Sequence, residues 1–197
     1  MRNFSITIRP ENITWEDLAR CQQLAHESNR AVGVNMQCAE LSAKDLREEI
    51  KNGTTLVALD ENGNLAGMLS IDFRRVNRWW HRGEAAYICY VAVSPEYKGM
   101  GIYRSLSQKS IEIIANRNIS VEYLNTHIRN TVALAAYEKD GYQKVRFSPG
   151  SGSDYYSTEM ARWLDGKGKN PILCKLMYYT SELLVRLIYK PGKIRRF

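Results

Sequence analysis

Apolar and polar positions alternate along this chain with two different periods. Apolar side chains at every second position, or in short unbroken runs, predict strands at 4–9, 54–59, 65–73, 84–93, 121–126, 142–147 and 155–163. Apolar side chains three and four residues apart predict helices at 15–29, 43–51, 102–116 and 131–140. The order is β-α-α-β-β-β-α-β-α-β-β, which combines hairpins with crossovers. It predicts the α/β class with a mixed sheet.

Capping and turn residues mark the ends of several of these elements. Thr14 and Ser42 precede the first two helices, each with an aspartate three residues later, as in a capping box. Asn62-Gly63 predicts a tight hairpin between two strands. The basic and aromatic segment 74–83 follows neither period, so we expect a loop there.

The stretch 87–106 joins a buried strand to a helix through a glycine-bearing loop. The strand ends at Ser94-Pro95, because proline has no N–H group for the sheet. Backbone N–H groups and the helix dipole favour an anion at a helix start, and Gly99 and Gly101 let the backbone approach it without a Cβ. Neither the Walker A pattern nor G-x-G-x-x-G is present. The stretch therefore predicts another kind of phosphate site, unless it is only a turn with two incidental glycines.

This loop resembles the acyl-CoA loop of the GNAT N-acetyltransferases, [RQ]-x-x-G-x-[GA] after a strand. The matching residues are Lys98-Gly99-Met100-Gly101-Ile102-Tyr103, where Lys98 stands for Arg or Gln and Tyr103 for the final small residue. A second stretch, NTVALAAYEKDGY at 130–142, resembles the family's N-x-x-A-x-x-x-Y-E-K-x-G-[FY]. The resemblance covers about residues 4–163. It implies the GNAT acyl-CoA N-acyltransferase fold, with a C-terminal helical extension.

The resemblance also implies where acetyl-CoA would bind as the acyl donor. It assigns the pyrophosphate to the backbone of residues 98–103. The amides of the pantetheine arm would bond to the backbone of Val91, Ala92 and Val93, because an open strand edge accepts such groups like another strand. Asn130 would bond the same arm, cap its helix, or do both. The alternative for Val91 and Val93 is plain core packing.

Two residues are candidates for moving protons. By the resemblance Tyr137 is the general acid, since a phenol with a pKa near 10 keeps its proton at neutral pH and can donate it to the departing thiolate. Glu84, at the start of the central strand, is the candidate base, with His81 as another option. Neither base matches a fixed family motif. A core-capping tyrosine, a solvated glutamate and a surface histidine are the structural alternatives.

The acceptor is an amine whose identity the sequence does not give. By the resemblance, segments 31–40 and 74–82 border its site. Trp79, Trp80 and His81 could wall a pocket there. Arg75, Arg78 and Arg82 could bind an acidic acceptor, bind a cofactor phosphate, or form a solvated face.

The net charge of +7 belongs entirely to the C-terminal segment. Residues 1–165 hold 20 basic and 20 acidic side chains, whereas residues 166–197 hold eight basic side chains and one acid, Glu182. The main domain therefore gives no reason to expect a nucleic-acid partner. We predict a catalytic domain at 1–165, followed by a basic amphipathic helix and tail at 166–197.

The C-terminal helix is expected to begin at Asn170-Pro171 and to end at Pro191-Gly192. One face is apolar: Ile172, Leu173, Leu176, Tyr179, Leu183, Leu187 and Ile188. Charged residues within the run make it a poor transmembrane span. We expect the stripe to dock on the domain or on a second copy in a homodimer; a peripheral membrane contact through 170–197 is the alternative.

The cysteines and the N-terminus bear on location and on metals. Cys21, Cys38, Cys89 and Cys174 are far apart without a C-x-x-C pair, which argues against a disulfide framework and predicts no metal site. The N-terminus lacks the apolar core of a signal peptide. A cytoplasmic location is expected, with membrane association through the C-terminal helix left open.

Together these features predict an N-acetyltransferase in which a primary amine attacks acetyl-CoA directly in a ternary complex. No cysteine lies in either motif, so we expect no covalent enzyme intermediate. One alternative keeps the fold but uses a longer acyl-CoA or an acyl-carrier protein. Another is a CoA-binding or interaction module without catalysis, which the departure at Tyr103 keeps open.

Overall fold

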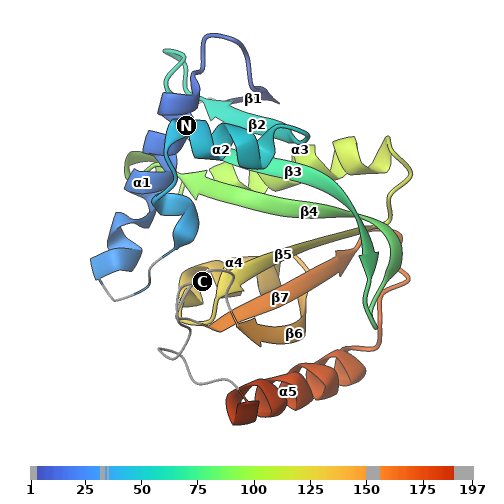
Figure 1. Ribbon diagram of the computed structural model, residues 1–197. Coiled ribbons are helices and arrows are strands. Elements are labelled where there is room, and N and C mark those ends of the chain that lie inside the picture. Colours follow the sequence, from blue (N-terminus) through green and yellow to red (C-terminus); the bar gives the residue numbers. More distant parts are fainter. Residues whose placement is uncertain (1–3, 32–33, 35, 150–155, 189–197) are drawn as a thin grey trace. The chain divides into compact units, whose positions relative to one another are not determined.

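The computed structural model describes residues 4–31, 34, 36–149 and 156–188. The chain divides into two compact units. The N-terminal unit holds residues up to 74 and 86–119, and the C-terminal unit holds 75–85 and 120 onward. Both units combine helices with strands, so the architecture is mixed α/β, as predicted (Figure 1).

In the N-terminal unit the strands follow the order β1-β2-β3-β4, and β2 pairs antiparallel with both β1 and β3. The tip of the β3–β4 hairpin, 75–85, belongs to the C-terminal unit. The elements in chain order are β1 (Ser5–Ile8), α1 (Trp15–Ala31), the 3₁₀ turn η1 (Gln37–Ala39), α2 (Ala43–Ile50), β2 (Thr54–Leu59), β3 (Leu65–Asn77), β4 (Arg82–Val93), the 3₁₀ turn η2 (Pro95–Tyr97) and α3 (Ile102–Ala115).

Both predicted N-caps are present, and the one at Thr14 forms a complete capping box. The Asp17 amide donates to Thr14 Oγ1 at 3.1 Å, and the Thr14 amide donates back to the Asp17 carboxylate at 2.9 Å. At α2 the Asp45 amide donates to Ser42 Oγ at 3.2 Å. Each cap stabilises its helix by about 1 kcal/mol. The local sequence therefore fixes where these two helices begin.

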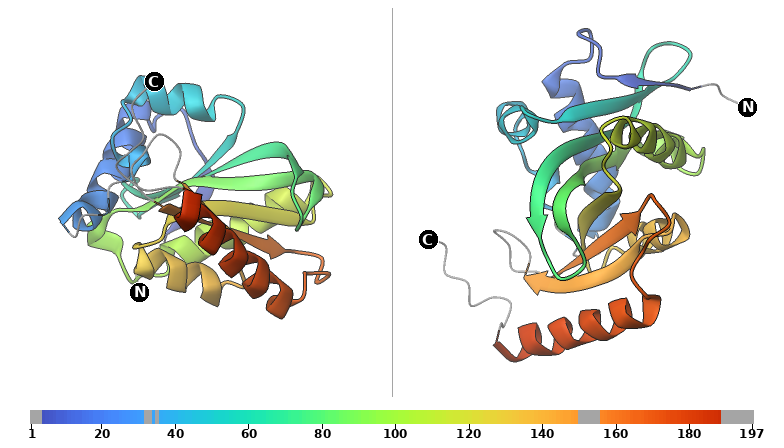
Figure 2. Two further views of the ribbon diagram at one scale, coloured as in Figure 1. Left: turned by 60° about the horizontal axis from the view of Figure 1, so that its bottom comes forward. Right: turned by 90° about the vertical axis from the view of Figure 1, so that its right-hand side faces the viewer.

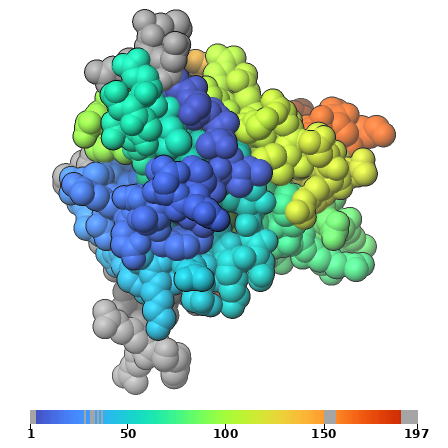
Figure 3. Space-filling view, turned by 90° about the horizontal axis from the view of Figure 1, so that it is seen from above, coloured from blue at the N-terminus to red at the C-terminus, as the bar shows by residue number. Residues whose placement is uncertain are grey.

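Helices α1 and α2 cover one face of the N-terminal strands, and α3 covers the other (Figure 2). Leu18 and Leu46 pack with Met68 of β3 in the core on the first face. Because side chains alternate along a strand, Gly67 faces the opposite side, where Ile102 of α3 lies against it. Seen from above, α1, α2 and the β2–β3 turn form much of this unit's surface (Figure 3).

In the C-terminal unit the strand order is β5-β7-β6, with β7 antiparallel to both neighbours. The elements are β5 (Val121–His127), α4 (Thr131–Lys139), β6 (Gln143–Pro149), β7 (Tyr156–Trp163) and α5 (Pro171–Ile188). Helix α5 groups with these strands in one compact unit. The domain boundary expected at 165/166 stays a prediction. The predicted loop at 150–152, the predicted strand start at 155 and the predicted helix end at 191–192 lie outside the described residues.

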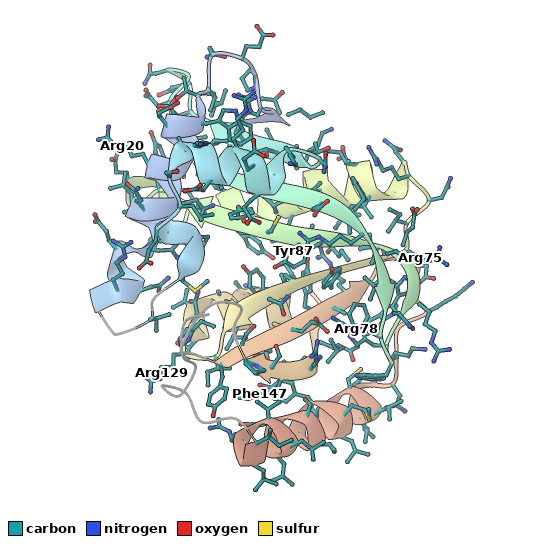
Figure 4. The ribbon with its side chains drawn as sticks, viewed as in Figure 1. Arg20, Arg75, Arg78, Tyr87, Arg129 and Phe147 are labelled. Atoms are coloured by element: carbon teal, nitrogen blue, oxygen red, sulfur yellow. The ribbon has the colours of Figure 1, made fainter. Side chains whose placement is uncertain are left out.

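The prediction of a loop at 74–83 is wrong. Strand β3 continues to Asn77 and β4 begins at Arg82, so only a four-residue turn remains, closed by the Arg78 amide donating to His81 O at 2.9 Å. Val76 is buried between the exposed residues Arg75 and Asn77, which is ordinary strand alternation. The exposed arginines of this segment made the two-residue alternation hard to recognise in the sequence. Arg75 and Arg78, both labelled in Figure 4, are exposed.

Candidate active site

The segment 94–101 turns the chain from β4 into α3. The Ser94 amide donates to Ala66 O at 2.9 Å, which holds the end of β4 against β3. The buried Tyr97 then donates its hydroxyl to Asp60 Oδ2 at 2.8 Å, which ties the loop to the β2–β3 turn. Residues 98–101 are exposed. The loop therefore has a fixed base and an open tip.

The Asp60 carboxylate that accepts this bond is held in its charged form. The Asn64 side-chain amide donates to it at 3.0 Å, and with the Asn64 and Asn62 backbone amides and Tyr97 it lowers the pKa of Asp60 to about 2. The Asp60 carboxylate that anchors the loop is therefore ionised at neutral pH and keeps accepting this hydrogen bond.

The tip of the loop contains two left-handed glycines. Gly99 has φ +79° and Gly101 has φ +80°, and no atom lies within 4 Å of a Cβ built on either of them. Gly101 is the N-cap of α3 and supplies no side-chain cap, and the first turn of a helix leaves amide groups without intrahelical partners. This start of α3 suits an anion such as a pyrophosphate.

The geometry favours a different register for the acyl-CoA loop pattern. Because α3 begins at Ile102, the two small positions are filled by Gly99 and Gly101, and Tyr103 lies inside the helix. Tyr103 then no longer departs from the pattern. Glu96 instead takes the place of the Arg or Gln.

Gly67 on β3 packs beneath the predicted donor-binding segments, and hydrophobic periodicity does not single it out. A Cβ at this position would lie 2.9 Å from both Ala92 O and Ile102 Cγ2. The glycine thus lets the backbone of β4 and the first residue of α3 approach β3 closely. An isolated glycine within a strand pattern is the signal that could have found it.

Strand β4 departs from regular geometry at Tyr90, directly before the predicted pantetheine segment. Tyr90 has φ +52°, which is uncommon for a residue with a bulky side chain. The fully buried Gln22 of α1 donates its side-chain amide to Tyr90 O at 2.6 Å, and the Tyr90 hydroxyl donates to Glu49 on α2 at 3.3 Å. These two helices therefore hold the distortion. A tyrosine in a strand pattern gives no sign of it.

The predicted binding segment follows at once. Ala92 is buried within the core that α1 and α2 cover, whereas Val91 and Val93 are half-buried. Core packing of the Ala92 side chain is thus observed, and its carbonyl points toward Gly67. The roles of residues 91–93 toward pantetheine remain predictions.

In the C-terminal unit, Asn130 caps α4. Its Oδ1 accepts from the Ala133 amide at 3.3 Å, and the side chain is 8% exposed. Tyr137, two turns later, is buried with its ring 5.8 Å from that of Tyr142. Arg162 lies over the Tyr142 ring and donates to Asp140 O at 2.9 Å, which fixes the end of the helix. The cap is established, while the roles of Asn130 and Tyr137 toward the donor remain predictions.

The tip of the β3–β4 hairpin is built differently from the expected pocket wall. Trp80 is completely buried and donates its indole N–H to Glu159 at 3.0 Å, and Trp79 donates to Val145 O at 3.2 Å. Both rings serve the packing of the C-terminal unit, so the prediction that they wall an acceptor pocket is not supported. His81 Nε2 donates to the carbonyl of Glu84 at 2.9 Å.

The Glu84 carboxylate is exposed on β4. Val91 lies seven positions further along the same strand, a span of about 23 Å at the usual strand rise. The assignment of Glu84 as the base stays a prediction that requires the acceptor or a water chain to cover this span.

The expected acceptor segment 31–40 is described only in part, since residues 32, 33 and 35 lie outside the described set. Beside it, the surface between α1 and η1 forms an open depression lined by Gln23, Glu27, Arg30, Ala39 and Glu40. His26 lies beneath this surface, with Asn29 Nδ2 3.0 Å from its Nδ1 and Cys38 Sγ 3.5 Å from its Nε2.

The His26–Cys38 pair is neutral. Burial lowers the pKa of His26 to about 4, with the charges of Lys98 and Arg30 adding to the shift, and burial raises the pKa of Cys38 to about 12. An activated cysteine needs the opposite shifts, toward thiolate and imidazolium. The pair is therefore poorly suited to act as a nucleophile.

Comparisons with known proteins agree with this architecture. Residues 15–142 match the family model described as "Acetyltransferase (GNAT) family". The chain is 36% identical over 68 residues to N-alpha-acetyltransferase 30 of Schizosaccharomyces pombe, a match that spans 34% of this chain and 45% of that protein.

Among solved structures, the ribosomal-protein-S18-alanine N-acetyltransferase from Escherichia coli aligns over 85% of this chain and 98% of its own, with a TM-score of 0.61 and 18% identity. A chain of the NatC complex bound to Gag peptide and CoA aligns over 82% of this chain and 99% of its own, with a TM-score of 0.63 and 15% identity. At these identities the likeness concerns the fold.

Proposed function

Because this chain belongs to the GNAT acetyltransferase family, we propose that it transfers an acetyl group from acetyl-CoA to a primary amine. The observation that carries the proposal is the start of α3. There, Gly99 and Gly101 leave an exposed helix terminus without a side-chain cap, on the loop that follows the distorted strand β4. Such a terminus binds a pyrophosphate through backbone amides and the helix dipole.

In the proposed mechanism this chain's residues hold the donor and move protons. The amides of 98–103 bind the pyrophosphate, and the backbone of 91–93 bonds the pantetheine amides. Acetyl-CoA supplies the activated thioester. Tyr137 gives its phenolic proton to the leaving thiolate, and a base, for which Glu84 is the candidate, takes the proton of the amine.

The cysteines support direct transfer to the amine. Burial raises the pKa of Cys21, Cys38 and Cys89 in the N-terminal unit, so each keeps its proton at neutral pH. A protonated, buried thiol is a poor nucleophile. We therefore propose attack by the amine on acetyl-CoA within a ternary complex, without an acetylated enzyme.

The proposal for the acceptor amine starts from the named relative. The Schizosaccharomyces pombe relative is named an N-alpha-acetyltransferase, and the match spans less than half of that protein. We propose the α-amine of a peptide N-terminus as the acceptor. Side-chain amines and small-molecule amines form the comparison set.

The test combines binding with turnover on the full chain. Acetyl-CoA is titrated calorimetrically, and initial rates are measured on peptides with free α-amines, on N-terminally blocked lysine peptides and on small amines. Turnover on any amine supports acetyl transfer, and a preference for free α-amines supports the acceptor class. Binding without turnover on the whole panel favours a CoA-binding module. Preference for longer acyl-CoA donors would change the donor, and absence of binding would overturn the proposal.

A further inference from the structure

Helix α5 exposes a broad apolar face. The side chains of this face are each between 42% and 79% exposed: Ile172, Leu173, Leu176, Tyr179, Leu183, Leu184, Leu187 and Ile188. A helix that is apolar nearly all round is normally buried. The face is long, because an 18-residue helix extends about 27 Å.

The opposite face of α5 is already docked. The Phe147 amide, on the edge strand β6, donates to Ser181 Oγ at 2.8 Å, and the Tyr178 hydroxyl lies 3.1 Å from Thr158 Oγ1. The Phe147 ring, labelled in Figure 4, packs edge-on against Tyr178 at 6.0 Å. Cys174 is buried on the same side. Docking of the helix is thus observed, but the expectation that the Leu-rich stripe would dock on the domain of the same chain is wrong.

The angular arrangement explains this. At 100° per residue, Leu176 and Leu183 lie roughly half a turn away from Cys174 and Tyr178. The docked side carries the groups that satisfy the β6 edge, and the aliphatic side faces outward. The docked side of α5 is held by β6 and β7. Any other surface that binds α5 must therefore contact its aliphatic face, along the length of the helix.

The aliphatic part of the exposed face has no side-chain group that needs a hydrogen-bond partner. Its hydroxyl at Thr180 already donates to Leu176 O at 2.8 Å. Tyr179 has a polar tip on an apolar ring, a combination enriched where an apolar layer meets water. Such a surface fits a fluid apolar phase better than a partner recognised through specific polar contacts.

The charges around the helix are strongly one-sided. Residues 166–197 contain eight basic side chains and one acid. That acid, Glu182, pairs with Arg186 at 2.8 Å, and Arg186 lies over the rings of Phe147 and Tyr156 on the docked side. Lys167, Lys169 and Lys175 are exposed.

We propose that α5 binds the surface of an anionic lipid bilayer, with its aliphatic face in the boundary between headgroups and acyl chains. The lysines would then lie at the headgroups, where each adds attraction to anionic lipid. A second copy of the chain is a poorer occupant, because pairing through this face brings two segments of charge +7 together and the single acid of each is already engaged. Among the described residues, no helix is long and apolar enough to cross a bilayer. The proposal goes beyond acetyl transfer and does not depend on it.

The experiment is sedimentation of the full chain with phosphatidylcholine vesicles, with and without phosphatidylserine, over a range of salt. The chain should sediment with the anionic vesicles, and less as salt rises. The double variant L176E/L183E should bind at least about a hundredfold more weakly. The triple variant K167Q/K169Q/K175Q should lose on the order of a hundredfold on anionic vesicles only. Ile8→Glu, which alters an exposed apolar residue of β1, is the matched control and should bind normally.

Three results would overturn the proposal. They are a full chain that stays in the supernatant at low salt, equal binding of L176E/L183E, or equal binding to neutral and anionic vesicles. Light scattering on the same samples tests the rival occupant: a dimer that L176E/L183E turns into a monomer would assign the face to a second copy. Should the double variant fail to fold, the lysine variant and the salt series decide, because they leave the aliphatic face unchanged.

Discussion

The N-cap residue of α3 is Gly101, which is exposed, has φ +80° and has no side chain to cap the helix. The N-cap residue of α4 is the buried Asn130, whose Oδ1 accepts from the Ala133 amide. Thr14, Ser42 and Asn170 likewise cap α1, α2 and α5. Within the described residues, α3 is therefore the helix that starts without a side-chain cap.

The difference separates two uses of a helix start. A side-chain cap adds about 1 kcal/mol of stability, which α3 lacks. What α3 has in place of a cap is a terminus open to an anion. The closed start of α4 instead fixes a helix whose Tyr137 lies two turns further on. The open terminus suits binding and the closed one suits placement of a catalytic group.

The largest expected effect concerns Tyr137, the residue that the capped helix α4 holds in place. Tyr137→Phe keeps the ring against Tyr142 and removes the proton, so turnover should fall by about 10²–10⁴ while acetyl-CoA affinity stays near normal. The measurement is kcat over pH alongside calorimetric affinity. Tyr142→Phe is the comparison and should affect stability more than rate. Unchanged turnover of Tyr137→Phe at all pH values would remove Tyr137 from the chemistry.

The next largest effect is expected from a substitution that blocks the open N-terminus of α3. Gly101→Val puts a branched side chain at φ +80° and at the mouth of the terminus, and should weaken acetyl-CoA binding by tenfold or more while the fold is kept. Gly166→Val is the matched control, because Gly166 also has φ +70° with no atom within 4 Å of its Cβ. Normal affinity of Gly101→Val would exclude this loop from the donor site.

A smaller effect tests the support beneath the open start. Gly67→Ala places a Cβ 2.9 Å from Ala92 O and Ile102 Cγ2, which pushes β4 and α3 away from β3. We expect a loss of about 1–3 kcal/mol in unfolding free energy and weaker acetyl-CoA binding. Gly168→Ala, whose Cβ would meet its nearest atom at 3.4 Å, is the control in denaturant titration. Wild-type behaviour of Gly67→Ala would show that the close approach has no role.

Gln22→Leu tests whether the distortion at Tyr90 is held from outside the strand. It removes the bond to Tyr90 O and leaves that carbonyl without its donor, which should lower the unfolding free energy by about 1–3 kcal/mol. The KM for acetyl-CoA should rise, because residues 91–93 follow directly. Gln23→Leu, on the exposed side of α1, should change neither quantity. A stability loss with an unchanged KM would limit Gln22 to packing.

The smallest effect concerns the anchor of the loop and its pH dependence. The pKa of Asp60 is lowered to about 2, below its unfolded value, so its contribution to stability is present above about pH 4 and is lost as pH falls through 2. Tyr97→Phe removes one donor and should raise that pKa slightly, with a small loss of acetyl-CoA affinity that is constant from neutral to mildly alkaline pH. A titration of the Asp60 carboxyl by NMR checks both. A midpoint near 4 in the unmodified protein would contradict the anchor.

Local signals predicted the order of elements, the helix caps at Thr14 and Ser42 and the glycine loop, because each depends on residues that are neighbours in sequence. Gly67 and the Gln22–Tyr90 contact depend on segments that meet only in the fold, and no periodicity encodes them. The exposed arginines disguised the strand around Val76. In α5 the apolar residues occupy almost the whole circumference, so their spacing alone could not predict which side docks. The docked side is the one whose Ser181 accepts a hydrogen bond from the Phe147 amide on the edge strand β6.

The β3–β4 hairpin has a consequence for dissecting the molecule. Trp80, at its tip, completes the interior around Tyr123 and Glu159, yet the chain returns afterwards to the N-terminal unit for residues 86–119. The two units are therefore interleaved along the polypeptide. No single break in the chain therefore separates the two units. During synthesis Trp80 emerges well before β5, β6 and β7, so the C-terminal unit can form only after those strands have been made.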